Sequence, residues 1–234
     1  MRVCFVGGTV LEQLRALVRA HAGRVQGPVR FRPGTWRPWL DPHGAGHVLG
    51  VGTESVGGPS GDRLITRNDL RAMRDRAGDD PEGHRDLFVA VMIWGSGTTN
   101  GRGPRYTNAA LSDPRMRPVL RTTRESVRDG HLKVAYRQFT LDGVGRSFST
   151  KWFASVDDRG DDRDRALILD DRVLRSLNAL GWSTREAAGR RDWPSRYAAY
   201  VSTMHAWAGE FGVTAEWLEW LLFDLNGQVR AETS

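Results

Sequence analysis

The chain has 234 residues, a hydrophobic content of 39% with nine tryptophans, a net charge of +6 and a pI near 10.2. This length allows one large domain, or a core of about 150 residues with an N-terminal extension. The apolar content excludes a disordered tail protein. The basic balance favours a polyanionic partner, since each Lys or Arg placed on a phosphate releases counterions. Nearly all the positive residues are Arg, which GC-rich coding would also produce.

The cysteine content and the N-terminal sequence limit the compartment. A single cysteine, Cys4, excludes an internal disulfide and a cysteine-ligated metal or iron–sulfur cluster within one chain. Glu12 and Arg15 come too early for a secretory signal, and no run reaches the roughly 18 apolar residues of a membrane span. We therefore expect a cytoplasmic protein in a reducing compartment, without a membrane partner.

The first eighty residues combine two predicted helices with a Gly/Pro-rich segment. Apolar residues recur at helical spacing over residues 9–22, and residues 65–76 form a second helical pattern with a Thr or Asn cap. Between them, residues 27–62 contain the motif Trp36-Arg-Pro-Trp39. We interpret this segment as an ordered loop held by its tryptophans. A flexible linker and a surface that faces nucleic acid are the alternatives.

A helical core is predicted from Pro81 to the end of the chain. The segment 86–94 is apolar on nearly all sides, which is typical of a buried central helix. Further helices are predicted over residues 106–112, 115–128, 132–139, 147–156, 172–180, 194–211 and 214–222. The sequence thus predicts an all-α fold of about eight helices, with residues 1–80 as an N-terminal extension and 81–234 as the core. The charged segment 157–165 is interpreted as a solvated loop, because its charges alternate in sign. Its aspartates do not indicate a calcium site, because the EF-hand pattern and its terminal Glu are missing.

The stretch Leu141-Asp-Gly-Val-Gly-Arg-Ser147 joins two of these predicted helices. Glycines two apart break the first helix and permit a turn too tight for a Cβ. Such a hairpin points consecutive backbone N–H groups outward at a helix N-terminus, which makes an anion site. Arg146 adds a positive charge beside it. The hairpin therefore indicates a phosphate ligand.

The motif L-x-G-V-G-R, followed by a helix and an apolar run that ends in Asp170, resembles the helix-hairpin-helix DNA glycosylase superfamily. Within that superfamily it is most similar to the branch with the 8-oxoguanine DNA glycosylase (OGG) fold. The resemblance implies that Gly143, Val144, Gly145 and Arg146 grip a DNA phosphate, and that Asp170 is the catalytic carboxylate. Asp170 also reads as an ordinary helix N-cap, and the two roles are compatible because the helix dipole keeps the carboxylate ionised.

The resemblance also implies a monovalent cation at the hairpin. The main-chain carbonyls of Phe139, Leu141 and Val144 match those that hold K⁺ or Na⁺ against the phosphate in this family. No other cofactor is expected.

The chain departs from the family pattern at one position. In the members that also cut the strand, the nucleophilic lysine lies two residues after the second hairpin glycine, where this chain has Ser147. Lys151 lies one helical turn later on the same face. Either the enzyme is monofunctional, or Lys151 provides the Schiff-base chemistry of an AP lyase through a shifted hairpin. Lys151 is equally well read as a packed or surface lysine.

The resemblance implies a monomeric, nucleoid-associated DNA glycosylase. It would flip an oxidised or otherwise modified base, such as 8-oxoguanine, out of double-stranded DNA and cleave its N-glycosidic bond, in repair or in defence against modified foreign DNA. One alternative is a non-catalytic helix-hairpin-helix DNA-binding protein. The Asp170→Asn variant distinguishes the two, because in an enzyme it should abolish base release and leave DNA binding unchanged. Another is a protein-interaction domain in which the Trp-rich C-terminal helices dock a partner.

Overall fold

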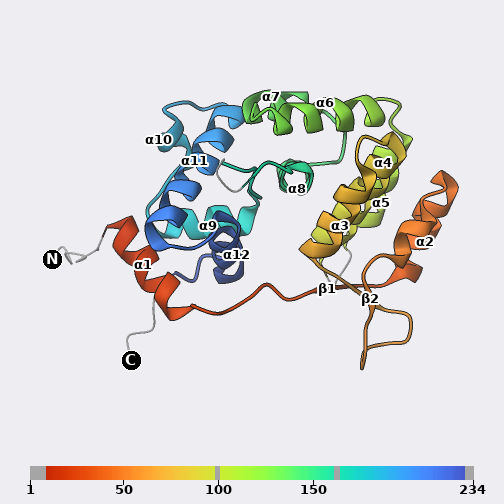
Figure 1. The fold of residues 1–234 in the computed structure, drawn as a ribbon, viewed down its shortest axis with the longest axis horizontal. Helices are drawn as coiled ribbons and strands as arrows, with labels where there is room; N and C mark the ends of the chain where they lie inside the picture. Colours follow the sequence, from red (N-terminus) through yellow and green to blue (C-terminus); the bar gives the residue numbers. More distant parts are fainter. Residues whose placement is uncertain (1–8, 98–100, 161–163, 230–234) are drawn as a thin grey trace. The chain divides into compact units, whose positions relative to one another are not determined.

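The computed structural model describes residues 9–97, 101–160 and 164–229 (Figure 1). They form two compact units. One contains residues 27–168, and the other joins the chain up to Gln26 with the chain from Leu169 onward. Twelve α-helices and three short strands occur in the described ranges, so the predicted all-α fold is confirmed. None of these helices is long and apolar enough to cross a membrane.

The unit of residues 27–168 opens with a small antiparallel sheet in the order β1-β3-β2. Its strands are β1 (Val29–Phe31), β2 (Thr53–Glu54) and β3 (Arg63–Ile65). Between β1 and β2 lie the helix α2 (Pro33–Leu40) and two 3₁₀ turns, η1 (Asp41–His43) and η2 (Gly46–Gly50). The segment is ordered, but its helix was not predicted, because Pro33 and Pro38 read as helix breakers. Burial of Trp36 and Leu40 stabilises the helix nevertheless.

The central helix of this unit is α4 (Pro81–Gly95). Asp80 caps it through hydrogen bonds from two backbone N–H groups, and Pro81 occupies the first helical position. Every residue from Leu87 to Ile93 is completely buried, as the all-round apolar pattern predicted. The helices that contact it are α3 (Arg67–Ala77), α5 (Gly103–Ser112), α6 (Met116–Arg128) and α8 (Arg146–Val156). Figure 1 shows α3, α4 and α5 side by side.

Two aromatic residues fix α8 against its neighbours. The indole N–H of Trp152 donates to Thr123 Oγ1 over 3.0 Å, and its ring meets the ring of Phe88 edge-on, with 6.0 Å between centroids. Phe153 packs edge-on against Phe139, at 5.7 Å between centroids, just beyond α7 (Leu132–Gln138). Because both side chains are fully buried, the rotation of α8 about its axis is set by packing.

The other unit contains α1 (Val10–Ala20), α9 (Asp171–Ala179), α10 (Thr184–Ala188), α11 (Trp193–Phe211) and α12 (Ala215–Leu225). About eight helices were predicted for the core and two for residues 1–80. The short helices α2 and α10, which were not predicted, bring the number in the described residues to twelve. The N-terminal segment packs with the C-terminal helices. Arg15 forms an ion pair with Glu210, and the indole N–H of Trp217 donates to the carbonyl of Arg24 over 2.8 Å. These unit limits differ from the predicted boundary near Pro81, which stays a prediction.

Candidate active site

The hairpin between α7 and α8 has a conformation that requires glycine. Gly143 has a φ of 76°, in the left-handed region, and an added Cβ would lie 3.4 Å from Cδ1 of Tyr106. The N–H of Val144 donates to the carbonyl of Leu141 over 3.3 Å and closes the turn. The side chains of Val144 and Leu141 are buried, whereas Gly143 and Gly145 are exposed. A tight turn is thus anchored by its apolar residues and presents its glycines to solvent.

The second helix of the motif, α8, begins directly after Gly145, and no side chain caps it. Its N-terminus carries the positive end of the helix dipole next to the exposed glycines. Arg146 is half-buried at the first helical position. This arrangement has the geometry of an anion site at a helix N-terminus. Binding of a DNA phosphate by these four hairpin residues remains a prediction.

Two arginines near the hairpin are the N-cap residues of α5 and α6. Tyr106, which lies against Gly143, accepts a hydrogen bond from Arg102 that raises the pKa of Arg102. Arg115 Nη2 lies 3.5 Å from Asp142 Oδ2 of the hairpin. Sequence reasoning missed Tyr106, because a contact between residues this far apart leaves no local pattern.

Lys151 is one of only two lysines in the chain, and the other, Lys133, is exposed on α7. The side chain of Lys151 is buried, with 6% of its surface exposed. Its Nζ donates to Ser147 Oγ over 2.6 Å and lies 5.6 Å from the centroid of the Phe148 ring. The side chain therefore runs back along α8 toward the N-terminus, as helical side chains do. Its amine lies at the level of Ser147, one turn closer to the hairpin than its own Cα.

Asp170 is the N-cap of α9, as one of its two predicted roles requires. Its Oδ1 accepts hydrogen bonds from the N–H groups of Arg172 (2.9 Å) and Val173 (3.1 Å), and 7% of its surface is exposed. These two backbone hydrogen bonds hold the carboxylate at the N-terminus of α9. Lys151 and Asp170 belong to different compact units.

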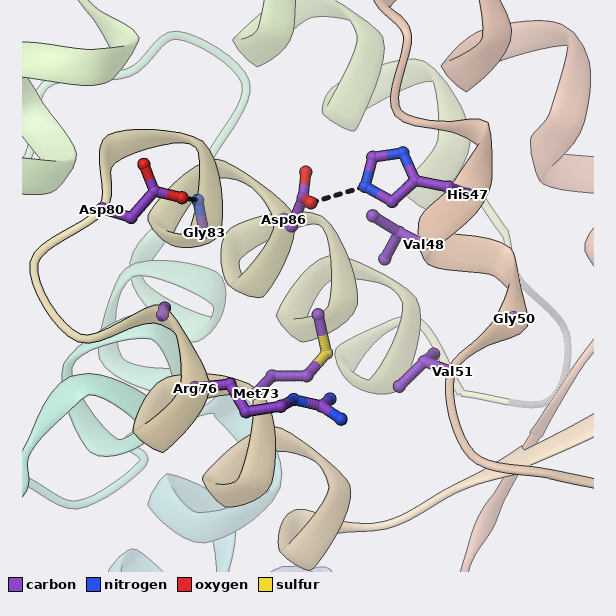
Figure 2. Close-up of a pocket in the computed structure, with 10 residues that line it drawn as sticks. His47, Val48, Gly50, Val51, Met73, Arg76, Asp80, Gly83 and Asp86 are labelled. Carbon is purple, nitrogen blue, oxygen red and sulfur yellow. Dashed lines mark hydrogen bonds and ion pairs between the residues drawn. The ribbon is translucent and has the colours of Figure 1, made fainter.

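A pocket of about 420 Å³ lies at the N-terminal end of α4 (Figure 2). Figure 2 shows Asp86 facing His47, whose Nε2 is 2.5 Å from Asp86 Oδ2. The C-terminal end of α4, at Gly95, lies against the Lys151 side chain. Asp86 precedes Gly95 by nine residues, so it lies about 13 Å away along the helix axis. No hairpin residue lines this pocket. Within the described ranges, no group of three His, Cys, Asp or Glu side chains has a metal-binding arrangement.

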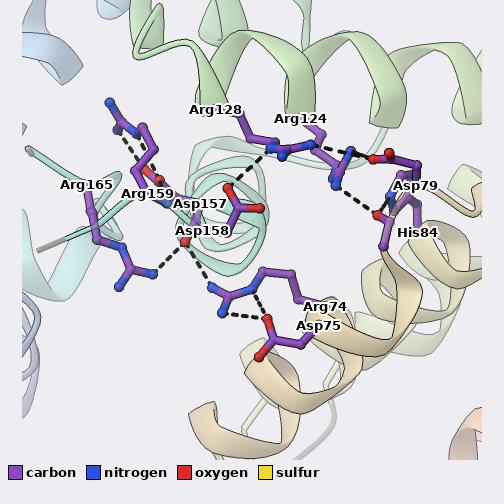
Figure 3. A network of polar contacts seen from close by, with 11 residues as sticks. Arg74, Asp75, Asp79, His84, Arg124, Arg128, Asp157, Asp158, Arg159 and Arg165 are labelled. Carbon is purple, nitrogen blue, oxygen red and sulfur yellow. Dashed lines mark hydrogen bonds and ion pairs between the residues drawn. The ribbon is translucent and has the colours of Figure 1, made fainter.

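The loop after α8 is organised by a network of arginines and carboxylates (Figure 3). Asp157 is completely buried, so the prediction of a solvated loop is wrong at this position. Its carboxylate accepts hydrogen bonds from Arg159 Nε (2.9 Å) and Nη2 (2.7 Å) and from the N–H of Ala166 (2.6 Å). The carbonyl of Asp157 accepts from Arg74 and Arg165. A compensated buried charge thus holds the two ends of the loop together.

A model of the family described as "Putative 8-oxoguanine DNA glycosylase OGG-like protein" matches residues 23–223. The match includes the hairpin, Lys151 and Asp170, and it confirms the resemblance inferred from the hairpin motif. It also extends well before Pro81, where the helical core was predicted to begin. No curated protein and no solved structure matches the chain.

The Asp157 network yields a prediction about stability. Asp157→Asn leaves the guanidinium of Arg159, whose side chain is 10% exposed, without its counter-charge, and we expect it to lower the free energy of unfolding by about 3 kcal/mol. The matched control is Asp158→Asn, which removes a carboxylate 35% exposed and 3.2 Å from Arg128. Its expected cost is below about 1 kcal/mol. Urea unfolding of both variants measures the difference, and equal losses would contradict the assigned role of Asp157.

Proposed function

Because the chain belongs to the OGG-like 8-oxoguanine DNA glycosylase family, we propose that it removes an oxidised or otherwise modified base from double-stranded DNA. The reaction would serve repair or defence against modified foreign DNA. The observation that carries the proposal is the amine of Lys151, which is buried and held at Ser147 at the hairpin end of α8. An amine so placed is suited to attack the sugar of a nucleotide whose backbone the hairpin holds.

The rarity of lysine relative to arginine in this chain supports a chemical role for Lys151. Of 34 Lys and Arg residues only two are lysines, so wherever a positive charge suffices this chain almost always has Arg. A guanidinium stays protonated and is no nucleophile, whereas the amine of lysine can lose its proton in a buried site. A buried lysine in so arginine-rich a chain is therefore most simply explained by amine chemistry.

The hairpin is the proposed DNA anchor. The backbone N–H groups at Gly143–Gly145 and the charge of Arg146 would bind a backbone phosphate while the target nucleotide leaves the stack. K⁺ or Na⁺ would bind the carbonyls of Phe139, Leu141 and Val144. These carbonyls fit that role: among the described residues, no backbone N–H donates to Phe139 or Val144, and the Leu141 carbonyl keeps a second lone pair.

The proposed reaction begins with the neutral amine of Lys151. Its lone pair bonds to C1′ as the bond from C1′ to the base breaks, and the electrons of that bond leave with the base, which takes up a proton. The attached amine releases a proton to water, and the role proposed for Asp170 is to stabilise the positive charge that develops on the sugar. The C1′–O4′ bond then opens, O4′ is protonated, and an iminium ion joins Lys151 to the sugar.

Borohydride trapping tests the role of Lys151. Reduction of the iminium ion should leave a stable adduct between protein and DNA in the wild type and in Lys133→Ala, which removes the exposed lysine. Lys151→Met fills the space of the stem without an amine, so it should form none. An adduct that persists in Lys151→Met would show that another amine reacts. Base release without any adduct would indicate a monofunctional enzyme that uses Asp170 and water.

The Asp170→Asn variant separates the charge of this residue from its capping role. Asparagine caps a helix about as well as aspartate, so we expect unchanged stability and DNA binding. Loss of the carboxylate should slow base release by roughly 10²- to 10⁴-fold. Asp192→Asn, which makes the same change at the N-cap of α11, is the control and should release base at the wild-type rate. Equal rates in both variants would assign Asp170 to capping alone.

A third prediction concerns the hairpin. Gly143→Ala strains the left-handed turn, and we expect about tenfold weaker binding to duplex DNA, or about 1.4 kcal/mol. Gly181→Ala imposes comparable strain at a φ of 83°, with no atom within 4 Å of the added Cβ, and should leave the affinity unchanged. Fluorescence anisotropy at fixed salt measures both. Equal affinities would argue against a DNA contact at the hairpin.

A further inference from the structure

Gly95, the last residue of α4, lies against the side chain of Lys151. A Cβ at this position would lie 2.7 Å from Lys151 Cδ, 3.2 Å from Lys151 Cε and 2.8 Å from Phe148 Cε1. A Cβ closer than 3.0 Å to another heavy atom requires that one of the two groups shift. The stem of Lys151 thus occupies the volume that any residue other than glycine would fill.

The need for glycine at this position is spatial. Its φ is not positive, so the backbone would accept alanine without strain. A helical glycine costs about 0.5–1 kcal/mol relative to alanine. Beyond its place at the end of the helix, the absence of a Cβ at Gly95 allows another group to approach closely. The approaching group here is the one buried lysine side chain of the chain.

We propose that Gly95 and Ser147 are positioning residues that deliver the amine of Lys151 to the hairpin. The missing Cβ of Gly95 leaves a passage for the Lys151 stem, and the hydroxyl of Ser147 holds Nζ at the end of that passage, 2.6 Å away. This inference rests on the proposed function, since it concerns the same amine.

The arrangement accounts for the departure of this chain from the family pattern. Lys151 starts four residues after Ser147, which corresponds to about 6 Å along the helix axis. The folded-back stem recovers that distance, because its Nζ reaches Ser147 Oγ. The amine therefore ends next to the residue at which the family's lysine begins.

Gly95→Ala is the decisive variant. The atoms that clash are the flexible end of Lys151 and the edge of the Phe148 ring, so these move and the fold remains. We expect adduct formation in single-turnover borohydride trapping to slow by roughly ten- to a hundredfold, with unchanged DNA affinity and stability. Gly209→Ala in α11 is the control, because no atom lies within 4 Å of its added Cβ, and its rate should be unchanged. Ser147→Ala should also slow the reaction, and Ser147→Thr should restore it through its hydroxyl.

A second readout needs neither DNA nor turnover. Protein labelled with ¹⁵N at lysine Nζ gives two Nζ signals, since the chain has only Lys133 and Lys151. Gly95→Ala and Ser147→Ala should each shift the Lys151 signal and leave the Lys133 signal in place. An unchanged trapping rate and unchanged signals in Gly95→Ala would overturn this inference alone. Base release from the wild type without any adduct would overturn this inference and leave the proposed base removal in place. Absence of base release would overturn both.

Discussion

The packing of α8 against α4 is the constraint on which the candidate site depends. Trp152 and Phe88 meet in the core, and this contact fixes how α8 is rotated. The same rotation turns Lys151 toward Gly95 and sends its amine back to Ser147. Because a protein core is as densely packed as a crystal, a displacement of either helix is transmitted to the amine. The same packing of α4 against α8 therefore buries the apolar side chains and sets the position of the Lys151 amine.

Positive charge in this protein is carried almost entirely by arginine side chains. Asp157 is completely buried, and Arg159 and a backbone N–H compensate its charge through hydrogen bonds of 2.6–2.9 Å. A planar guanidinium with several donors satisfies a buried carboxylate better than an ammonium group does. The aromatic contacts fix α8, and this polar network stabilises the loop that follows α8.

The sequence predicted most helices because their start signals are local. Thr66 and Asp69 form a capping box at α3, and Thr214 caps α12, as expected of these residue types. The hairpin was predicted from two glycines and an adjacent helical pattern. The sequence did not reveal α2, where prolines conceal a helix that burial of Trp36 maintains. Nor did it reveal that Gly95 approaches Lys151, since that contact joins residues 56 positions apart that share no periodicity.

The glycine at position 95 and the burial of Lys151 explain each other. A glycine in a helix is unfavourable by itself, and a buried lysine is unfavourable by itself. Side by side, the glycine gives the lysine stem its space, and the stem fills what would otherwise be a void at the end of α4. A Leu or Met side chain would fill such a void at lower cost, because it brings no charge into the core. The presence of an amine there, in a chain that otherwise relies on arginine, is the feature that packing alone does not explain.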